Sequence, residues 1–532
     1  MRKLRVVVRA AMMVAVLCIG EARAQTDQQL LDDIQQVSFQ YFWNEANPVN
    51  GLVKDRSTPG SPASIAAVGF GLSSICVAID HGWVTHTAGR DRVRTTLQTF
   101  WNAPQGPGSN GFIGYKGLYY HFLDMNTATR VWESELSTID TALLFAGILD
   151  AKQYFQGSDP EEVDIRALAD SIYFRADWEF MRNFNSGILH GWKPESGFAG
   201  FPQWIGYNEA MILYILALGS PTHPVPASTW NAWTSGYQWQ THYGYSYVAF
   251  GPLFGHQYSH CWVDFRAGKD AYMQNPFRNI TYFENSRRAT LAQRGYSIAN
   301  PGGFAGYSDI LWGLTASDDP PPEPLYAAHG APGPGTFDNG TITPTAPASS
   351  LPFAPEVVLP VLRNMYNNYP SLWGPYGFRD AFNLSVNWYA TDYLGIDQGP
   401  IVMMIENYRT QSVWNRFMLN PHIQQGLLRA GFVGVTGVDD GPNAGVGLEL
   451  YPAQPNPFVD RASLRFRLAR EGSVRLTLHD LAGREVARLV DGVRPAGMHV
   501  ETVSRGSLAS GVYYCHLQGN GQSQIRKLVL LQ

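Results

Sequence analysis

The chain has 532 residues, with 39 lysines and arginines against 44 acidic residues and a net charge of −5 at neutral pH. This length predicts more than one domain and allows a large buried core. Apart from its first ten residues, the sequence has no cluster of lysines and arginines, which argues against a protein that binds nucleic acid.

The first 24 residues have the pattern of a bacterial secretory signal peptide. Basic residues between Arg2 and Arg9 precede an apolar run from Ala10 to Ile19, which is too short to span a bilayer. The small residues around Arg23 then match a cleavage site. We therefore expect a mature protein that begins near Gln25 and is secreted or attached to the outer surface of the cell.

A helical pattern dominates from about residue 27 to residue 432, beginning with apolar residues at helical spacing such as Leu30, Ile34 and Tyr41. Long loops rich in Gly, Pro and aromatic residues separate the helices, and such loops are more often functional than accidental. We predict a helical toroid whose loops form a cleft at one end, with the Pro- and Gly-rich stretch Asp318–Ser350 as an ordered loop within it. After Ile65–Ile79, further helices are predicted at Leu136–Lys152, Asp164–Arg182, Asn208–Leu218, Glu284–Tyr296, Pro355–Tyr369 and Pro400–Met418.

The pattern changes after Phe432. Residues 434–447 are small, as expected of a linker, and short alternating runs separated by turn residues follow. The predicted organisation is a signal peptide at 1–24, a helical domain at 25–433, a linker at 434–447 and a small antiparallel β-sandwich at 448–532. Its strands are expected at Ser463–Leu468, Ser473–Asp480, Glu485–Asp491, His499–Val503, Gly511–Gln518 and Ile525–Leu531.

Several short strings stand in a characteristic order and include Ser137–Leu144, Tyr207–Ile212, His260–Arg266, Tyr282–Arg288, Trp312–Asp318, Tyr376–Phe382 and Leu394–Pro400. In this order they resemble the glycoamylase-like family, which includes glycoside hydrolase family 144, over roughly residues 27–432. The resemblance implies a mainly α fold, an (α/α)6 barrel. It also implies an endo-β-1,2-glucanase that cuts linear β-1,2-glucan into short sophoro-oligosaccharides with inversion, without a metal or other cofactor.

The C-terminal part resembles a different group of domains. Tyr451–Phe458, His479–Glu485, Leu508–Tyr514 and Lys527–Leu531 are similar to the C-terminal sorting domains of type IX secretion, and also to immunoglobulin-like domains of the flagellar-hook-cap type. A sorting domain implies contact with the secretion machinery and passage across the outer membrane. The alternative is a stabilising or spacer module.

Glycoside hydrolysis needs two carboxyl groups, separated by roughly 6.5–9.5 Å in an inverting enzyme. Glu209 is the first candidate, although it could simply be a first-turn acid next to an Asn208 cap, where the helix dipole would lower its pKa. Burial beside Trp204 and Tyr207 would have the opposite effect. Asp140 is the second candidate, although Ser137 and Asp140 also fit a capping box. Glu135 is the reserve candidate.

The remaining candidates are expected to bind sugar, through aromatic stacking or through hydrogen bonds to hydroxyl groups. Core packing, helix capping or a structural ion pair is the alternative for each of them. These substrate-binding candidates are Trp204, Tyr207, Trp262, Asp264, Arg266, Arg379, Asp380, Asp397 and Glu406.

Other classes of protein remain as alternatives. A polysaccharide lyase would need a Tyr, His or Lys base, whereas the acidic strings favour a hydrolase. A hydrolase of another glucan linkage and a non-catalytic glycan-binding surface protein are further alternatives. The histidines show no metal-binding spacing, and Cys76, Cys261 and Cys515 form neither a disulfide framework nor a zinc motif, so we expect buried thiols. We expect a monomer.

Overall fold

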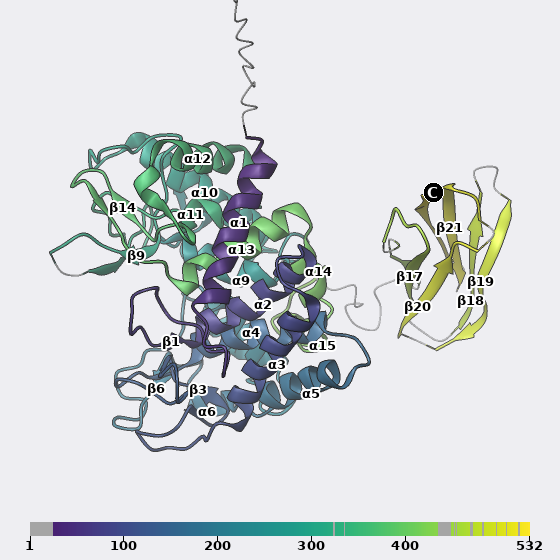
Figure 1. Cartoon of the computed structure of the whole chain (residues 1–532), viewed down its shortest axis with the longest axis horizontal. Helices are drawn as coiled ribbons and strands as arrows, with labels where there is room; N and C mark the ends of the chain where they lie inside the picture. The colour runs from purple at the N-terminus through teal and green to yellow at the C-terminus, as the bar shows by residue number, and fades with distance from the viewer. Residues whose placement is uncertain are drawn as a thin grey trace, which may run out of the picture. The chain divides into compact units, whose positions relative to one another are not determined.

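The computed structural model describes residues 25–434 and 448–531, except 323, 324, 335, 452, 454, 469–471, 481–483, 496, 507, 520 and 521 (Figure 1). The predicted signal peptide and the predicted linker, apart from Gly434, lie outside these residues. The chain divides after Phe432 into two compact units, one helical and one built of strands. Among the described residues, no helix combines the length and the apolar character needed to cross a membrane.

The centre of the helical unit is a closed ring of inner helices, almost all of whose residues are buried. Helices that are buried around their whole circumference lie inside a large core. Around the ring, α2 packs against α4, α4 against α7, and α7 against α9; α11 packs against α13, and α13 against α2. The remaining step is a hydrogen bond in which the Gln257 side-chain amide, just before α9, donates to the Ala346 carbonyl of α11 at 2.6 Å. The ring consists of α2 (Ile65–Asp80), α4 (Thr138–Tyr154), α7 (Met211–Gly219), α9 (Tyr258–Trp262), α11 (Thr345–Ala348) and α13 (Gly395–Arg409).

The closest approach within the ring lies between α2 and α4. A Cβ atom on Gly69 would lie 2.3 Å from the Leu143 carbonyl oxygen, and one on Gly147 would lie 2.0 Å from the Gly69 oxygen. Only glycine at both positions allows the two backbones to come this close.

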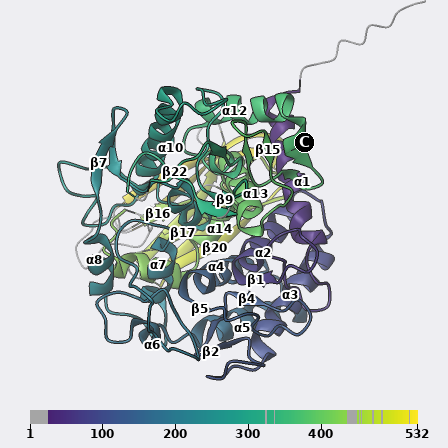
Figure 2. The same cartoon turned by 90° about the vertical axis from the view of Figure 1, so that its left-hand side faces the viewer.

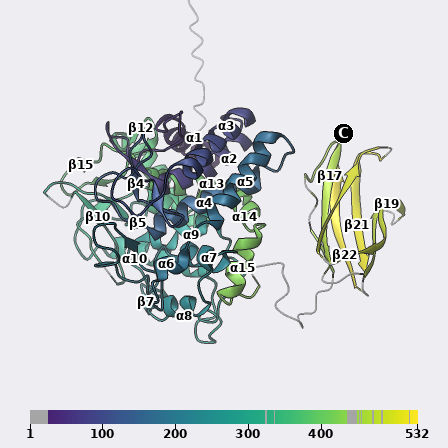
Figure 3. The same cartoon turned by 90° about the horizontal axis from the view of Figure 1, so that it is seen from below.

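Outer helices cover the ring and bury one face each (Figures 2 and 3). For example, α1 packs against α2 and α13, α5 against α4, and α15 against α7. The predicted (α/α)6 barrel is therefore confirmed. The outer helices are α1 (Asp27–Asn44), α3 (His86–Asn102), α5 (Pro160–Phe174), α10 (Tyr282–Ala299), α12 (Pro355–Asn368) and α15 (Pro421–Arg429), with short α6 (Trp178–Arg182), α8 (Ser228–Thr234), α14 (Ser412–Phe417), η1 (Leu253–His256) and η2 (Pro370–Leu372) between them.

Several helix predictions need correction. The helix predicted at Asp164–Arg182 ends at Phe174, and α6 begins after Asp177, whose side chain caps it by accepting from the Phe180 amide. The helix predicted at Pro400–Met418 is likewise divided into α13 and α14, and α13 already begins at Gly395. Helices α3, α8, α9, α11 and α15 were not predicted, and three of these are too short for a helical period to show.

Short paired strands lie in the loops, and two of them, β1 and β5, lead directly into α2 and α4. The Pro- and Gly-rich stretch is ordered over its described residues and contains the last residue of β9, all of β10 and β11, and α11. The pairs are β1 (Ala63–Ser64) with β4 (Phe122–Leu123), β2 (Gly114–Tyr115) with β3 (Leu118–Tyr119), β5 (Leu136–Ser137) with β6 (Gly191–Trp192), β7 (Trp239–His242) with β8 (Tyr245–Val248), β9 (Ala316–Asp318) with β10 (Tyr326–Ala328), and β12 (Trp373–Gly374) with β13 (Gly377–Phe378); β14 (Phe382–Asn383) pairs with both β11 (Thr341–Ile342) and β15 (Trp388–Tyr389).

The C-terminal unit consists of two antiparallel sheets around one core. Their orders are β16-β17-β20 and β19-β18-β21-β22, and buried residues of both sheets, such as Phe466 and Leu517, form the shared core. All six predicted strands are present, and only β16 was not predicted. The strands are β16 (Leu448–Leu450), β17 (Arg461–Leu468), β18 (Gly472–His479), β19 (Glu485–Arg494), β20 (Gly497–Ser504), β21 (Gly511–Gly519) and β22 (Gln522–Leu530).

Candidate active site

Carboxyl groups gather where the inner helices begin. Asp140 is the third residue of α4, Asp397 is the third residue of α13, and Glu209 lies two residues before α7. These acids are close enough for the charge of one to change the pKa of another. The charge of Asp140 acts to raise the pKa of both Glu209 and Asp55, and the charge of Asp55 acts to raise the pKa of Asp397. The fold thus brings together acids that are far apart in the sequence.

Glu209 has the environment of a proton donor. Its half-buried carboxyl group is desolvated, and burial together with the charge of Asp140 raises its pKa to about 7. Glu209 does not lie in the first turn of a helix capped by Asn208, as it could have, because α7 begins only at Met211. The Asn208 side chain accepts a hydrogen bond from the Ala210 amide, before the helix begins. Ser259 fixes this turn, since its hydroxyl donates to the Glu209 carbonyl and accepts from the Ile212 amide, both at 3.0 Å. Desolvation therefore outweighs the dipole of the nearby helix.

A histidine links the other two predicted catalytic acids. His121 Nδ1 lies 2.9 Å from Glu135 Oε1, and its Nε2 lies 3.6 Å from Asp140 Oδ2. Burial alone would lower the pKa of His121, but Asp140 and Glu135 outweigh it and raise the pKa to about 9. For Glu135 the effect of burial has the opposite sign and acts to raise the pKa. The hydrogen bond from His121 outweighs it, so the pKa of Glu135 lies below its ordinary value.

The capping role expected of Ser137 is also present. Its hydroxyl accepts from the Asp140 amide at 3.2 Å and donates to Asp140 Oδ2 at 2.5 Å. The Asp140 carboxyl is thus oriented by Ser137 on one side and by His121 on the other. Ligand atoms of His121, Glu135 and Asp140 lie within 4.8 Å of one another.

We expect His121→Gln to destabilise the helical unit in a pH-dependent way. The folded-state pKa of about 9 lies above the ordinary 6.5, so the stabilisation from protonated His121 is fully present below 6.5 and is lost as the pH rises through 9. Urea unfolding, followed by tryptophan fluorescence, should show a loss of about 1–2 kcal/mol near pH 6 that shrinks toward pH 10. An equal loss at both pH values would contradict a charged His121. All 15 tryptophans precede Phe432, so this signal reports the helical unit.

A second acidic group surrounds the start of α13. Asp380 and Asp397 are buried and hydrogen-bond to each other through their side chains, while the Asp318 amide donates to Asp380 Oδ2 at 2.6 Å. Burial raises the pKa of Asp397 to about 7, and burial and the Asp397 charge raise the pKa of Asp380. Two adjacent buried carboxyl groups cannot both ionise, so this pair holds a proton near neutral pH.

Arg56 balances part of this negative charge. Its guanidinium group lies 2.9 Å from Asp318, 3.4 Å from Asp55 and 3.7 Å from Asp392. Sequence reasoning missed Arg56, Asp55, Asp392 and His121, because no local motif marks them. Asp318 ends one of the family-like strings, which is the one signal that could have identified it.

Three predicted sugar-binding residues lie close to the acids. Trp204 stacks on His190 with 3.6 Å between ring centroids and donates to Thr138 at the start of α4, and the buried Tyr207 lies two residues before Glu209. The partly exposed Arg379, next to Asp380 in the chain, donates to the Thr391 carbonyl at 2.9 Å.

Four other candidates lie away from these acids, so their predicted role in binding sugar beside them is corrected. Trp262 is completely buried against Phe70 in the core. Glu406 lies nine residues after Asp397, about 13 Å further along α13, where it binds His81 at 2.7 Å. Asp264 and Arg266 follow the C-terminal end of α9 and pair with each other at 2.6 Å. All four are therefore structural at the end of the barrel away from the acids.

Comparison with known proteins agrees with this fold. The family model described as "Putative glucoamylase" matches residues 202–421, and that of the secretion system C-terminal sorting domain matches residues 452–531. A Bacteroides uniformis protein of the first description has a solved structure with a TM-score of 0.71 and 36% identity, covering 77% of this chain and 99% of that one.

Two relatives have names that state an activity. An endo-β-1,2-glucanase from Chitinophaga pinensis, solved with sophorotriose and glucose, is 31% identical with a TM-score of 0.69 over 77% of this chain and 99% of that one. An exo-β-1,2-glucooligosaccharide sophorohydrolase from Parabacteroides distasonis is 33% identical over 76% of this chain, which spans 58% of the length of that relative. On this evidence the chain belongs to the glycoamylase-like family, and it carries a C-terminal sorting domain of a secretion system.

Proposed function

We propose that this protein is a glycoside hydrolase that cleaves β-1,2-glucan and releases short sophoro-oligosaccharides with inversion. The observation that carries the proposal is Glu209, a carboxyl group with a pKa of about 7 that lies near other acids where the inner helices begin. The two relatives named for β-1,2-linked substrates, one endo-acting and one exo-acting, support the choice of linkage. No cofactor takes part in the proposed mechanism.

Glu209 is the proposed general acid. Its proton passes to the glycosidic oxygen as the bond to the anomeric carbon breaks, and a water molecule attacks from the opposite face of the sugar. An acid with a pKa near the working pH is both protonated and able to give up its proton, which makes it an efficient donor.

The base that takes a proton from the attacking water is proposed to be Asp140 or Asp397. Asp140 is held in place by Ser137 and His121, with Glu135 fixing the imidazole from its other side. Asp397 has a pKa of about 7 and a neighbour, Asp380, that can share the proton it takes up. An inverting mechanism further requires a base roughly 6.5–9.5 Å from the acid.

We expect the purified mature chain to release short oligosaccharides from linear β-1,2-glucan but not from β-1,3-glucan or starch. Product sizes early in the reaction distinguish the two modes of attack: products of mixed length indicate endo cleavage, and sophorose alone indicates exo cleavage. Anomeric analysis of the first products tests inversion, and absence of an unsaturated sugar excludes a lyase. Cleavage of another glucan would keep a hydrolase and reject the linkage, while no cleavage of any of the three would favour a glycan-binding protein.

We also propose that a signal peptide at residues 1–24 exports the chain, with boundaries at 25–433, 434–447 and 448–532 for the remaining parts. The sorting domain supports secretion or attachment to the outer surface and implies a contact with the secretion machinery. The enzyme is proposed to act as a monomer.

A further inference from the structure

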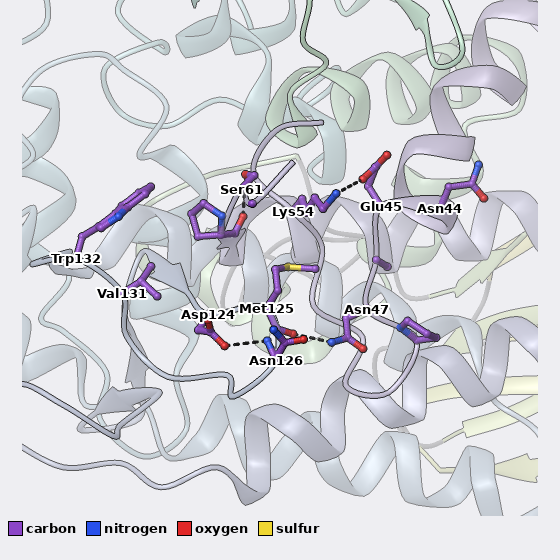
Figure 4. Close-up of a pocket in the computed structure, with 14 residues that line it drawn as sticks. Asn44, Glu45, Asn47, Lys54, Ser61, Asp124, Met125, Asn126, Val131 and Trp132 are labelled. Atoms are coloured by element: carbon purple, nitrogen blue, oxygen red, sulfur yellow. Dashed lines mark hydrogen bonds and ion pairs between the residues drawn. The ribbon is translucent and has the colours of Figure 1, made fainter. Parts of the chain in front are cut away.

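A cavity of about 620 Å³ opens beside the strand pair β1–β4, outside the acidic groups described above. Figure 4 shows Trp132 on one side of it, the ion pair of Lys54 and Glu45 on the other, and Asp124 to Asn126 along its floor. The lining therefore combines one large aromatic face with amide, carboxylate and ammonium groups, a mixture suited to a sugar ring with its apolar faces and polar rim.

Trp132 is held in an unusual state. The residue is 69% exposed, and its backbone lies in the left-handed region at φ 53°, which is rare for a bulky residue and costs conformational energy. Neighbouring residues impose this conformation, because the buried Arg130 side chain donates to the Ser134 carbonyl at 2.6 Å and pairs with Glu195 at 2.7 Å. A large aromatic residue is thus mostly exposed on a turn that a buried arginine spans.

The floor of the cavity is formed in advance of any ligand. Asp124 Oδ1 accepts from the amides of Asn126 and Thr127, and the side-chain amides of Asn47 and Asn50 both donate to the Met125 carbonyl. A preformed loop loses little conformational freedom when it binds, which favours affinity.

The charges of the lining favour a neutral ligand. Lys54 is its single cation, and this ammonium group is paired with Glu45 at 2.6 Å. Asp124 is occupied by amides of its own loop, and these hydrogen bonds lower its pKa. No unpaired cation among the lining residues is left for a phosphate or a uronate, so an uncharged sugar fits better than an acidic one.

Aromatic contacts connect this cavity to the acids. The Trp132 ring packs edge-on against Phe122 at 5.2 Å between centroids, and Phe122 stacks on His121 at 3.8 Å, the residue that bridges Glu135 and Asp140. Side-chain contacts therefore link Trp132, through Phe122 and His121, to the predicted catalytic acids.

We propose that the cavity between Trp132 and Lys54 is a distal subsite that binds a glucose unit of a long neutral glucan, with the Trp132 indole as its stacking surface. This inference rests on the proposed function, which supplies the glucan. Binding so far from the reacting bond holds the ground state and the transition state equally, so it lowers KM without changing kcat.

The test compares Trp132→Ala with the wild-type chain on long linear β-1,2-glucan and on short sophoro-oligosaccharides. We expect KM for the long substrate to rise roughly 3- to 10-fold, with kcat unchanged and with no change for substrates too short to reach the cavity. Trp101→Ala is the matched control, because Trp101 is also exposed, at 39%, but lies at the end of α3 outside the cavity, and it should leave both substrates unaffected.

Binding of the same glucan to Glu209→Gln and to Glu209→Gln combined with Trp132→Ala, measured by affinity electrophoresis, separates the two proposals. Weaker binding on loss of Trp132 supports the subsite, whether or not the wild-type chain cleaves β-1,2-glucan. Failure of the wild-type chain to cleave this glucan would reject the proposed function but not the subsite. Unchanged KM and unchanged binding in Trp132→Ala would overturn the subsite while leaving cleavage intact. Unfolding of each variant by heat checks that the substitutions leave the fold unaffected.

Discussion

Glu209→Gln should reduce kcat on β-1,2-glucan by about 10³-fold, within the range of roughly 10²–10⁴ that a general acid contributes. Glutamine keeps the size of the side chain and its hydrogen-bonding capacity but has no acidic proton to give to the leaving oxygen. The wild-type rate should fall as the pH rises through about 7, the pKa of Glu209, and this alkaline limb should be missing from the residual activity of the variant. Initial rates on long glucan across this pH range provide the measurement.

The stability of this variant serves as the control. The pKa of Glu209 is raised from 4.5 to about 7 by folding, so the wild-type chain loses stability as the pH rises between these values. Glu209→Gln should therefore be more stable than the wild type by roughly 1–3 kcal/mol near pH 8 and equal to it near pH 4. An inactive variant that is less stable at both pH values would indicate a structural role for Glu209.

The same assay identifies the base. Between Asp140→Asn and Asp397→Asn, the substitution that removes the base should lower kcat as strongly as Glu209→Gln, whereas loss of a positioning residue should act more on KM. If neither substitution lowered kcat by more than about tenfold, the two-carboxylate mechanism would be wrong for this chain.

Asp150→Ala should destabilise the helical unit by about 3–5 kcal/mol, because it leaves a buried charge without its partner. Arg416 Nε lies 2.6 Å from Asp150 Oδ1, and Nη2 lies 2.8 Å from Oδ2, in a two-pronged contact between α14 and the C-terminal half of α4. The Asp150 side chain is fully buried, and only 9% of the Arg416 side chain is exposed. Urea unfolding followed by tryptophan fluorescence measures the change.

The double variant Asp150→Leu with Arg416→Met provides the comparison. Replacing both charged groups by apolar side chains removes the buried charge, so this pair should be considerably more stable than Asp150→Ala alone. Similar losses in both variants would indicate that packing, rather than the uncompensated charge, explains the effect. Activity per folded molecule should stay close to wild type in both, since the ion pair lies away from the acids.

Several features followed from local patterns. The outer helix α1 and the inner helix α2 were predicted because their apolar residues recur at helical spacing, and the six strands of the C-terminal unit because theirs alternate. Helices α9 and α11 were missed because they have only a few residues each and are fixed by contacts such as that between Gln257 and Ala346. Local sequence does not encode such contacts.

The candidate site was predicted in part. Family-like strings identified Glu209, Asp140, Asp380 and Asp397, but the strings could not show that His121 lies between Glu135 and Asp140. The same strings also suggested Trp262 and Glu406 as sugar-binding residues, because a Trp or a Glu is as suitable for that role by residue type as the residues that do lie near the acids.

The sequence by itself determined the helical unit, the smaller strand-rich unit, the family, and the acids at the centre of the hypothesis, because periodicity and short motifs are properties of neighbouring residues. Only the tertiary structure decided which end of each inner helix carries the acids, which acids meet there, and that burial raises the pKa of Glu209 to about 7. These depend on desolvation and on charges contributed by helices far apart in the chain, which exist only once the ring has closed.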